Sequence, residues 1–583
     1  MMSFRSCARL SLICAVFLAY PVGSLWAQIA YDSPQSLEDG PDGDTKSLGS
    51  PYIELDSWIY PALERLAALA YIDEGFLGTR PWTRIGCALL VEEAGDKIRS
   101  NQSDSPEAND LYEALLKEFQ PDLNASTGSG DRYIHLGSLY ASATEIAGRP
   151  LNDSYHFGQT VINNYGRPYQ QGFNSYDGFS GWAAAGRFVA YVRGEYQHAP
   201  SAPGYSLPVR QLIATIDRNP LQPLTPVPTA NQFRFLDTYV AAKVAGWNLA
   251  FGKQSLWWGP AEGSALLFSN NAEPIYMFRV SRIVPFTLPW ILRWLGPMKV
   301  DAFYGKLSGN DFPPRPLIHG EKISFKPTPN LELGFTRTAE FGGVGRPFTF
   351  ERVWRSYFSV IGPEHRTPAN DPGKRTGGFD VNYRVPFLRN WLTVYTDSLS
   401  DDDISPLCCP GRAGLNPGVY LARFPKIHKL DLRMEGVLTD TPNRGGPQFN
   451  YFDSFYHDLY TNKNNIIGSW IGRDGQGLQA WSTYWFRPRN SLQFGYRHAK
   501  VSKDFIPSGE TLNDGSVKLS WWMRDDLSLS TFVQYEKWLA PILAPRAQTN
   551  WTSRMELCFE PRGWSLPLRP DRQGRGRAPV DSD

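Results

Sequence analysis

RFVAYVRGEY, residues 187–196, decides the fold because side chains of two different kinds alternate along it, so that every second residue has the same character. In an extended chain Phe188 and Tyr196 lie on one face, while Arg193 and Glu195 lie on the other. One apolar face and one charged face suit a wall that separates lipid from a wet lumen. The stretch therefore predicts a membrane-spanning strand.

The same period of two runs from Tyr133 to Phe559, for example through residues 527–535 and 551–559. Backbone polar groups in lipid must be paired, so such a sheet has to close on itself. At roughly 10 residues per strand plus turns and loops, residues 131–560 suit a large antiparallel transmembrane β-barrel of about 16–18 strands. A two-sheet sandwich would also alternate, but its core would have to absorb this whole length in one domain.

A helical period replaces the alternation over residues 51–125. Apolar residues recur at helical spacing from Trp58, Thr83 is placed to cap a second helix through Ile98, and Leu111–Phe119 forms a third. We expect an otherwise mainly β protein with an N-terminal α-helical segment.

Two interpretations of this helical segment stay open. The run from Tyr60 to Arg84 is similar to one S-layer-homology repeat, and such repeats often bind cell-wall polymers. That likeness implies peptidoglycan as a partner in the periplasm. The favoured alternative is a small helical bundle that docks on the periplasmic mouth of the barrel as a plug.

The two ends of the chain differ from the rest. Residues 1–27 have the basic start, apolar run and small-residue end of a secretory signal peptide. Residues 28–50 are expected to be a linker, and residues 561–583 a disordered tail. After the signal, no apolar run reaches the roughly 18–20 residues of a transmembrane helix. The balance of 59 basic and 58 acidic residues argues against a nucleic-acid partner.

FGKQSLWWGPAEGSALLFSNNAEPIYMF, residues 251–278, is the strongest candidate for a binding site. Trp257 and Trp258 stand at the end of a predicted strand, beside Gln254 and Glu262. Their rings suit stacking on sugar C–H faces, with the amide and acid groups bonding hydroxyls. As girdle residues they would instead meet lipid headgroups. At least one is expected in the girdle, because neighbours on a strand point opposite ways.

Basic residues on the predicted strands are the other candidates. We interpret them first as lumen charges and second as ligand clamps: Lys306, His319 and Lys322, with Lys253, Arg279, Arg282 and Lys326. A basic lumen ring would attract an acidic polysaccharide.

No catalytic, cofactor or metal motif stands out. His319 and Glu321 lack a third group that orients them, and no G-x-S-x-G or H-E-x-x-H occurs. Asp401–Asp403 lacks the glycine and glutamate of an EF-hand loop, which favours a solvated acidic loop over a loose Ca²⁺ site. We expect no enzyme, no cofactor and no metal. No zinc spacing or pairing follows from the remaining cysteines, Cys87, Cys408, Cys409 and Cys558.

Four stretches carry a resemblance to a known family: Gly252–Pro260, Leu267–Pro274, Phe303–Gly309 and His319–Asn330. They resemble the capsule assembly family typified by the Wzi protein, and the likeness runs through most of residues 51–560. The family implies an outer-membrane barrel with a periplasmic helical element and a surface role in capsule retention. It supplies no catalytic residues.

We therefore expect a lectin-like outer-membrane protein that anchors exported capsular or extracellular polysaccharide, with outer-membrane lipid as its other partner. Its loops would lie at the cell surface and its helical segment in the periplasm. A porin or diffusion channel is the alternative, and bulky Pro-containing loops favour an occluded barrel over an open pore. A carbohydrate-active enzyme is a third hypothesis, which needs two carboxylates facing each other across a cleft.

Overall fold

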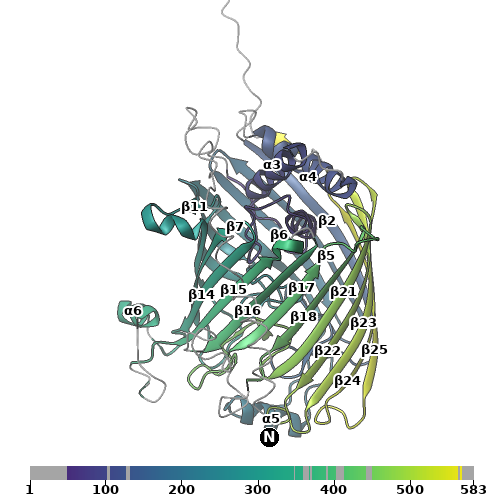
Figure 1. Cartoon of the computed structure of the whole chain (residues 1–583). Helices are drawn as coiled ribbons and strands as arrows, with labels where there is room; N and C mark the ends of the chain where they lie inside the picture. The colour runs from purple at the N-terminus through teal and green to yellow at the C-terminus, as the bar shows by residue number, and fades with distance from the viewer. Residues whose placement is uncertain are drawn as a thin grey trace, which may run out of the picture.

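In the computed structural model, eighteen long strands form one closed barrel in which every neighbouring pair is antiparallel (Figure 1). This confirms the predicted fold class. The expected signal, nearly all of the linker, most of the tail and the Cys408–Cys409 pair lie outside the described residues. Those residues are 49–100, 105–125, 132–346, 348–358, 365, 367, 370–388, 391–401, 413–441, 450–561 and 565–567.

The wall runs in chain order and closes where β25 pairs with β2, with Trp551 opposite Ala147. Short strands β11 (Phe286–Thr287) and β26 (Ser565–Pro567) add to it. The long strands are β2 (Arg132–Ala147), β5 (Gly172–Ala185), β6 (Phe188–Ala199), β7 (Ala230–Val244), β8 (Trp247–Gln254), β10 (Ile275–Arg282), β12 (Pro297–Lys306), β13 (Leu317–Thr328), β14 (Leu331–Phe341), β15 (Lys374–Arg384), β16 (Leu392–Asp401), β17 (Gly414–Leu421), β18 (Leu430–Leu438), β21 (Gly475–Arg487), β22 (Asn490–Val501), β23 (Glu510–Arg524), β24 (Leu527–Leu539) and β25 (Gln548–Phe559).

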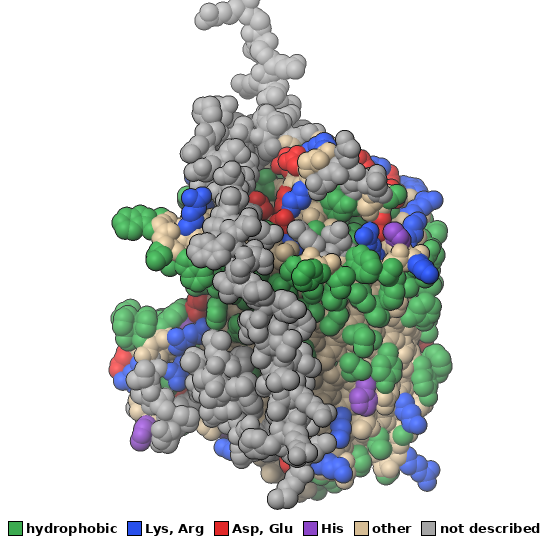
Figure 2. Space-filling view, in the orientation of Figure 1, with side chains coloured by type: hydrophobic (Ala, Val, Ile, Leu, Met, Phe, Trp, Pro, Cys, Tyr) green, Lys and Arg blue, Asp and Glu red, His purple; other side chains and the backbone are tan. Residues whose placement is uncertain are grey.

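The outer face of the wall is apolar. Phe188, Phe251 and Met555 are each more than half exposed there, while Arg193 and Glu195 point inward and are buried. Figure 2 shows hydrophobic side chains spread over the wall, with charged side chains gathered toward its two ends. The alternation read from the sequence therefore separates an apolar exterior from a polar interior. None of the described helices is long and apolar enough to cross a membrane.

The two ends of the barrel differ in how their strands are joined. At one end, turns of two residues join β5 to β6, β7 to β8, β13 to β14, β21 to β22 and β23 to β24. At the other end the connections are long, among them residues 148–171, 200–229, 255–274 and 439–474. We call these the short-turn end and the loop end. Helices α3 and α4 lie at the short-turn end and α5 (Leu207–Ile216) at the loop end (Figure 1).

The helical segment folds into α2 (Ile59–Ala68), α3 (Arg84–Ser100) and α4 (Pro106–Ala125) around its own apolar core. The Thr83 hydroxyl accepts from the Gly86 amide at 3.1 Å, so Thr83 begins α3 as its spacing predicted. The segment docks on the inner wall, where Arg384 of β15 donates to the carbonyl oxygens of Ala67 and Ile72, each at 2.8 Å.

The long connections pack together at the loop end. Leu266 and Phe268, Tyr451 and Trp470 belong to one buried apolar cluster with inward residues of the wall such as Phe303. Protein interiors of this kind are close-packed and leave few voids. The loops therefore fill this end of the lumen instead of lining an open mouth.

Candidate functional site

Residues 255–274, which join β8 to β10, run inside the barrel, and we call them the insert. Every residue of the insert except Glu262 is buried. Its short strand β9 (Trp257–Trp258) pairs with β1 (Thr79–Arg80) of the helical segment, and the Gly259 amide donates to the Gly78 carbonyl at 2.9 Å. The insert thus joins the helical segment to the loop end.

Carboxylates on the inner wall hold the backbone of the insert. Asp397 of β16 accepts from the Leu266 amide at 2.7 Å, and Glu435 of β18 accepts from the amides of Glu262 and Gly263 at 2.7 and 2.9 Å. Buried amides need such partners where no strand pairing supplies them. Part of the polar inner face therefore serves the insert and does not line a water-filled pore.

The structure places the two tryptophans away from lipid and from the loop surface. Trp258 is 1% exposed, and its ring packs against Phe268 and Phe303 at centroid distances of 5.1 and 5.5 Å. Trp257 is 4% exposed and lies under the Arg80 guanidinium. Trp257 and Trp258 therefore form neither part of a girdle nor an exposed stacking pair. The position of the two tryptophans after a strand wrongly predicted a place at the membrane interface, because the chain that follows β8 turns into the lumen.

Three further predicted residues also lie inside the barrel but do not meet. Gln254 is buried and donates to the Met277 carbonyl at 3.3 Å. Lys322 is a lumen charge paired with Asp380. Glu262 has a side chain that is 44% exposed, 3.5 Å from Arg80. Only Glu262 and Trp257 of the predicted set line the large cavity described below.

His319 faces outward, so its interpretation as a lumen charge is wrong. It shares the strand parity of Ile323, which is 43% exposed. Helix α6 (Phe350–Phe358) covers it: His319 Nε2 lies 2.9 Å from Ser356 Oγ, Nδ1 lies 2.9 Å from Glu321, and the Tyr357 ring stacks on the imidazole. His319 is thus buried on the outer wall by a helix that the strand pattern does not reveal, while the Glu321 side chain stays 30% exposed.

Lys306 is also an outward residue and not a lumen charge. It lies directly opposite Tyr276, which is 59% exposed, and directly opposed residues share a face of the sheet. Beside it, α6 projects from the outer wall (Figure 1) and presents Phe350, Trp354 and Phe358, each more than half exposed. This face continues the apolar exterior of β13 and β14.

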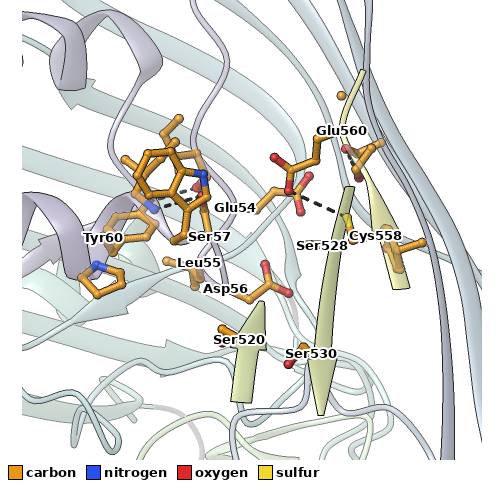
Figure 3. A pocket seen from close by; sticks show the side chains of 18 of the residues that line it. Glu54, Leu55, Asp56, Ser57, Tyr60, Ser520, Ser528, Ser530, Cys558 and Glu560 are labelled. Atoms are coloured by element: carbon orange, nitrogen blue, oxygen red, sulfur yellow. Dashed lines mark hydrogen bonds between the residues drawn. The ribbon is translucent and has the colours of Figure 1, made fainter. Parts of the chain in front are cut away.

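A cavity of about 840 Å³ lies between the helical segment and the inner face of the wall. Room exists because inward residues are small here: Ser491, Ser520 and Ser530 lie in register across β22, β23 and β24. Figure 3 shows the stretch from Glu54 to Tyr60 facing these strands. The turn residue Arg489 lines the cavity, so the cavity extends to the short-turn end.

Aromatic and charged side chains share this lining. The Arg489 guanidinium lies 3.3 Å from the ring centroid of Trp522, and Arg193 donates to Asp56 at 2.9 and 3.1 Å. Burial alone would raise the pKa of Asp56, but the charge and hydrogen bond of Arg193, together with the charge of Arg167, outweigh it and lower that pKa. Ring faces beside polar groups suit a polar ligand such as a sugar. The sequence analysis missed this site; its signal was the pair Ser528 and Ser530, which are spaced by two on the inward face of β24.

An ionic cluster fastens three loops at the loop end. His156 lies 2.9 Å from Asp153 and 2.8 Å from Asp217, which also pairs with Arg473 at 2.5 Å. Burial would lower the pKa of His156, but the two carboxylates outweigh it and raise that pKa to about 10. The pKa of Asp217, which burial would raise, is brought down to about 2 by His156 and Arg473.

Comparison with known proteins agrees with this architecture. Residues 141–553 match the family model of the capsule assembly protein Wzi. The chain belongs to the Wzi family. The structure of Escherichia coli Wzi, an outer-membrane protein involved in group 1 capsule assembly and a carbohydrate-binding β-barrel, superposes with a TM-score of 0.61. It covers 88% of this chain and 99% of Wzi at 17% identity, so it shows a shared fold.

Two other comparisons are weaker. A Klebsiella pneumoniae protein of the cps region, an uncharacterized 55.8 kDa protein, is 29% identical over 180 residues, which span 30% of this chain and 35% of that relative. Pseudomonas aeruginosa OpdQ covers 75% of this chain and all of its own at 9% identity, with a TM-score of 0.40. Membership of the Wzi family and the closed barrel make this chain an outer-membrane β-barrel.

Proposed function

We propose that this protein binds exported capsular or extracellular polysaccharide and retains it at the cell surface without catalysing a reaction. The single observation that carries the proposal is the filled lumen of a Wzi-family barrel: the insert and the loops occupy the space that a channel would need. A porin keeps a water-filled path through its lumen, so that alternative is disfavoured.

The difference between the two ends supports a proposed orientation. Outer-membrane barrels have short periplasmic turns and longer extracellular loops. The short-turn end with α2–α4 would thus face the periplasm, and the fastened loops would meet the polysaccharide outside. The helical segment acts in this proposal as a plug, since its contacts are with the inner wall; peptidoglycan is a second partner only if α3 and α4 offer it a free face.

Of the residues singled out in the sequence, Trp257 and Glu262 remain candidate sugar contacts because both line the large cavity. Each hydrogen bond adds roughly 0.5–1.5 kcal/mol net, so one site is weak. Retention of a polymer would therefore rest on many copies and many repeats, with avidity in place of affinity.

Deleting the gene tests the proposal. Cell-bound polysaccharide should fall and polysaccharide in the medium should rise, while total synthesis stays unchanged. Complementation with the full chain should reverse both changes. Unchanged partition between cells and medium would refute the proposal.

A further inference from the structure

A second cavity of about 210 Å³ continues the large one deeper into the lumen. The two share lining residues, among them Asn164, Tyr176, Lys518 and Arg554. A volume of this size is that of about seven water molecules, which suits one small ring and not a polymer. A ligand entering at the short-turn end would reach it through the large cavity.

The wall of this cavity carries a row of inward side chains in register. Gln493 of β22 pairs with Lys518 of β23, Lys518 with Phe532 of β24, and Phe532 with Arg554 of β25. Adjacent strands lie about 4.8 Å apart, so the Cα atoms of Lys518 and Arg554 are roughly 10 Å apart on one face. The Arg554 guanidinium also lies over the Phe532 ring, 5.4 Å from its centroid.

Among the described residues, neither of these two cations forms an ion pair, although the charge of Glu556 acts on Lys518 from a greater distance. Four basic side chains line the small cavity, together with a single acidic one, Asp514. Arg497 pairs with Asp514 and Glu536, and Arg167 pairs with Glu195. In the described part of the chain, neither Lys518 nor Arg554 has a carboxylate within 4.0 Å.

Glu556, two residues from Arg554 on the same inner face, is bonded by the Tyr176 hydroxyl. It forms no ion pair with either cation among the described residues. Two like charges on one polar wall repel each other, and an anion between them would relieve that repulsion. The row therefore has the electrostatics of an anion site.

The remaining lining groups suit a sugar more than a simple anion. The ring of Trp481 and the ring of Phe532 line the cavity, and Gln493 offers an amide. The buried Thr552 hydroxyl, also in the lining, has no hydrogen-bond partner among the described residues. Aromatic faces, an amide and a free hydroxyl are groups that bind sugar rings and hydroxyls.

We propose that the Lys518–Arg554 row is a subsite for one anionic sugar residue, a carboxylate-bearing pyranose of the uronate class. The inference rests on the proposed function and deepens it, because it names the charge and class of the saccharide. The site lies inside the barrel and is reached from the short-turn end. It is thus distinct from any contact that the polysaccharide makes with the outer loops.

Titration calorimetry on the full chain in detergent tests this subsite, with tri-galacturonate, maltotriose and inorganic phosphate as probes. Tri-galacturonate should bind most tightly, and more weakly at high salt. The Lys518→Gln, Arg554→Gln double variant should raise its Kd at least tenfold, because each charge-assisted bond is worth a factor of about ten or more. The single Lys518→Arg variant keeps the charge and should retain binding.

The matched control is Lys500→Gln with Lys537→Gln, on outward positions of β22 and β24, which should leave Kd unchanged. Binding of tri-galacturonate that is equal in both double variants, or matched by maltotriose or phosphate, would overturn the subsite. Heat-modifiable migration of each variant checks that the barrel is folded. Cell-bound polysaccharide is measured separately. If the Lys518→Gln, Arg554→Gln variant loses uronate binding while the cells keep their polysaccharide, the subsite is supported and retention of the polymer does not depend on it.

Discussion

The substitution Trp258→Ala tests most directly whether packing of the insert fills the barrel. The side chain is 1% exposed and packs on Phe268 and Phe303, and its indole N–H donates to Asp301 at 3.3 Å. Truncating a buried Trp costs roughly 3–5 kcal/mol. Asp301 keeps its bond from Arg279 at 2.9 Å, so no unpaired charge adds to that cost.

Hydrogen exchange measured by mass spectrometry reports this loss of stability for each segment of the chain separately. At about 1.4 kcal/mol per factor of ten, a cost of roughly 3–5 kcal/mol means that amides of residues 255–274 should exchange about 10² to 4 × 10³ times faster in Trp258→Ala, while β21–β25 keep their protection. Trp521→Ala is the matched control, because Trp521 faces outward on β23 and is 42% exposed. Unchanged protection of the insert in Trp258→Ala would refute the conclusion that Trp258 holds the insert in place inside the barrel.

Three further outcomes follow from the same contacts. The raised pKa of His156 means that its contribution to loop stability is complete below its ordinary value of 6.5 and is lost as pH rises through about 10; protease cleavage of residues 148–171 should rise across that window, and His156→Gln should abolish the pH dependence. In planar bilayers the full chain should show no stable open channel; a large steady conductance of the intact chain would contradict the filled lumen. A nitroxide at Trp354→Cys should be more accessible to oxygen than to a water-soluble nickel complex, because the exposed face of α6 continues the apolar wall; the reverse order would place that face in water.

The barrel was predictable because its evidence is local. Each strand shows its own lipid-facing and inward residues, as Phe188 and Glu195 do, and closure follows from the need to pair backbone groups in lipid. The helices were predictable for the same reason, since caps such as Thr83 and apolar spacing lie within a few residues of one another.

The site was not predictable because it depends on where connecting segments go. A strand-end Trp257–Trp258 pair looks the same whether the chain turns toward lipid or into the lumen, and only the distant partners Asp397 and Glu435 decide it. Likewise, the parity of His319 places it outward, but its burial comes from α6, about 37 residues later. The polar character of His319 on a strand therefore predicted a residue that faces the lumen, whereas His319 faces outward and α6 covers it.

Direct binding tests the central claim most closely. The full chain, purified and inserted in nanodiscs, is immobilised and exposed to purified capsular or extracellular polysaccharide from the same cells, and binding is measured by interferometry. We expect saturable binding that shorter oligosaccharides of the polymer weaken by competition, and the apparent affinity should rise with the density of immobilised protein. Absence of binding at every polysaccharide concentration, by protein that is folded by heat-modifiable migration, would contradict it.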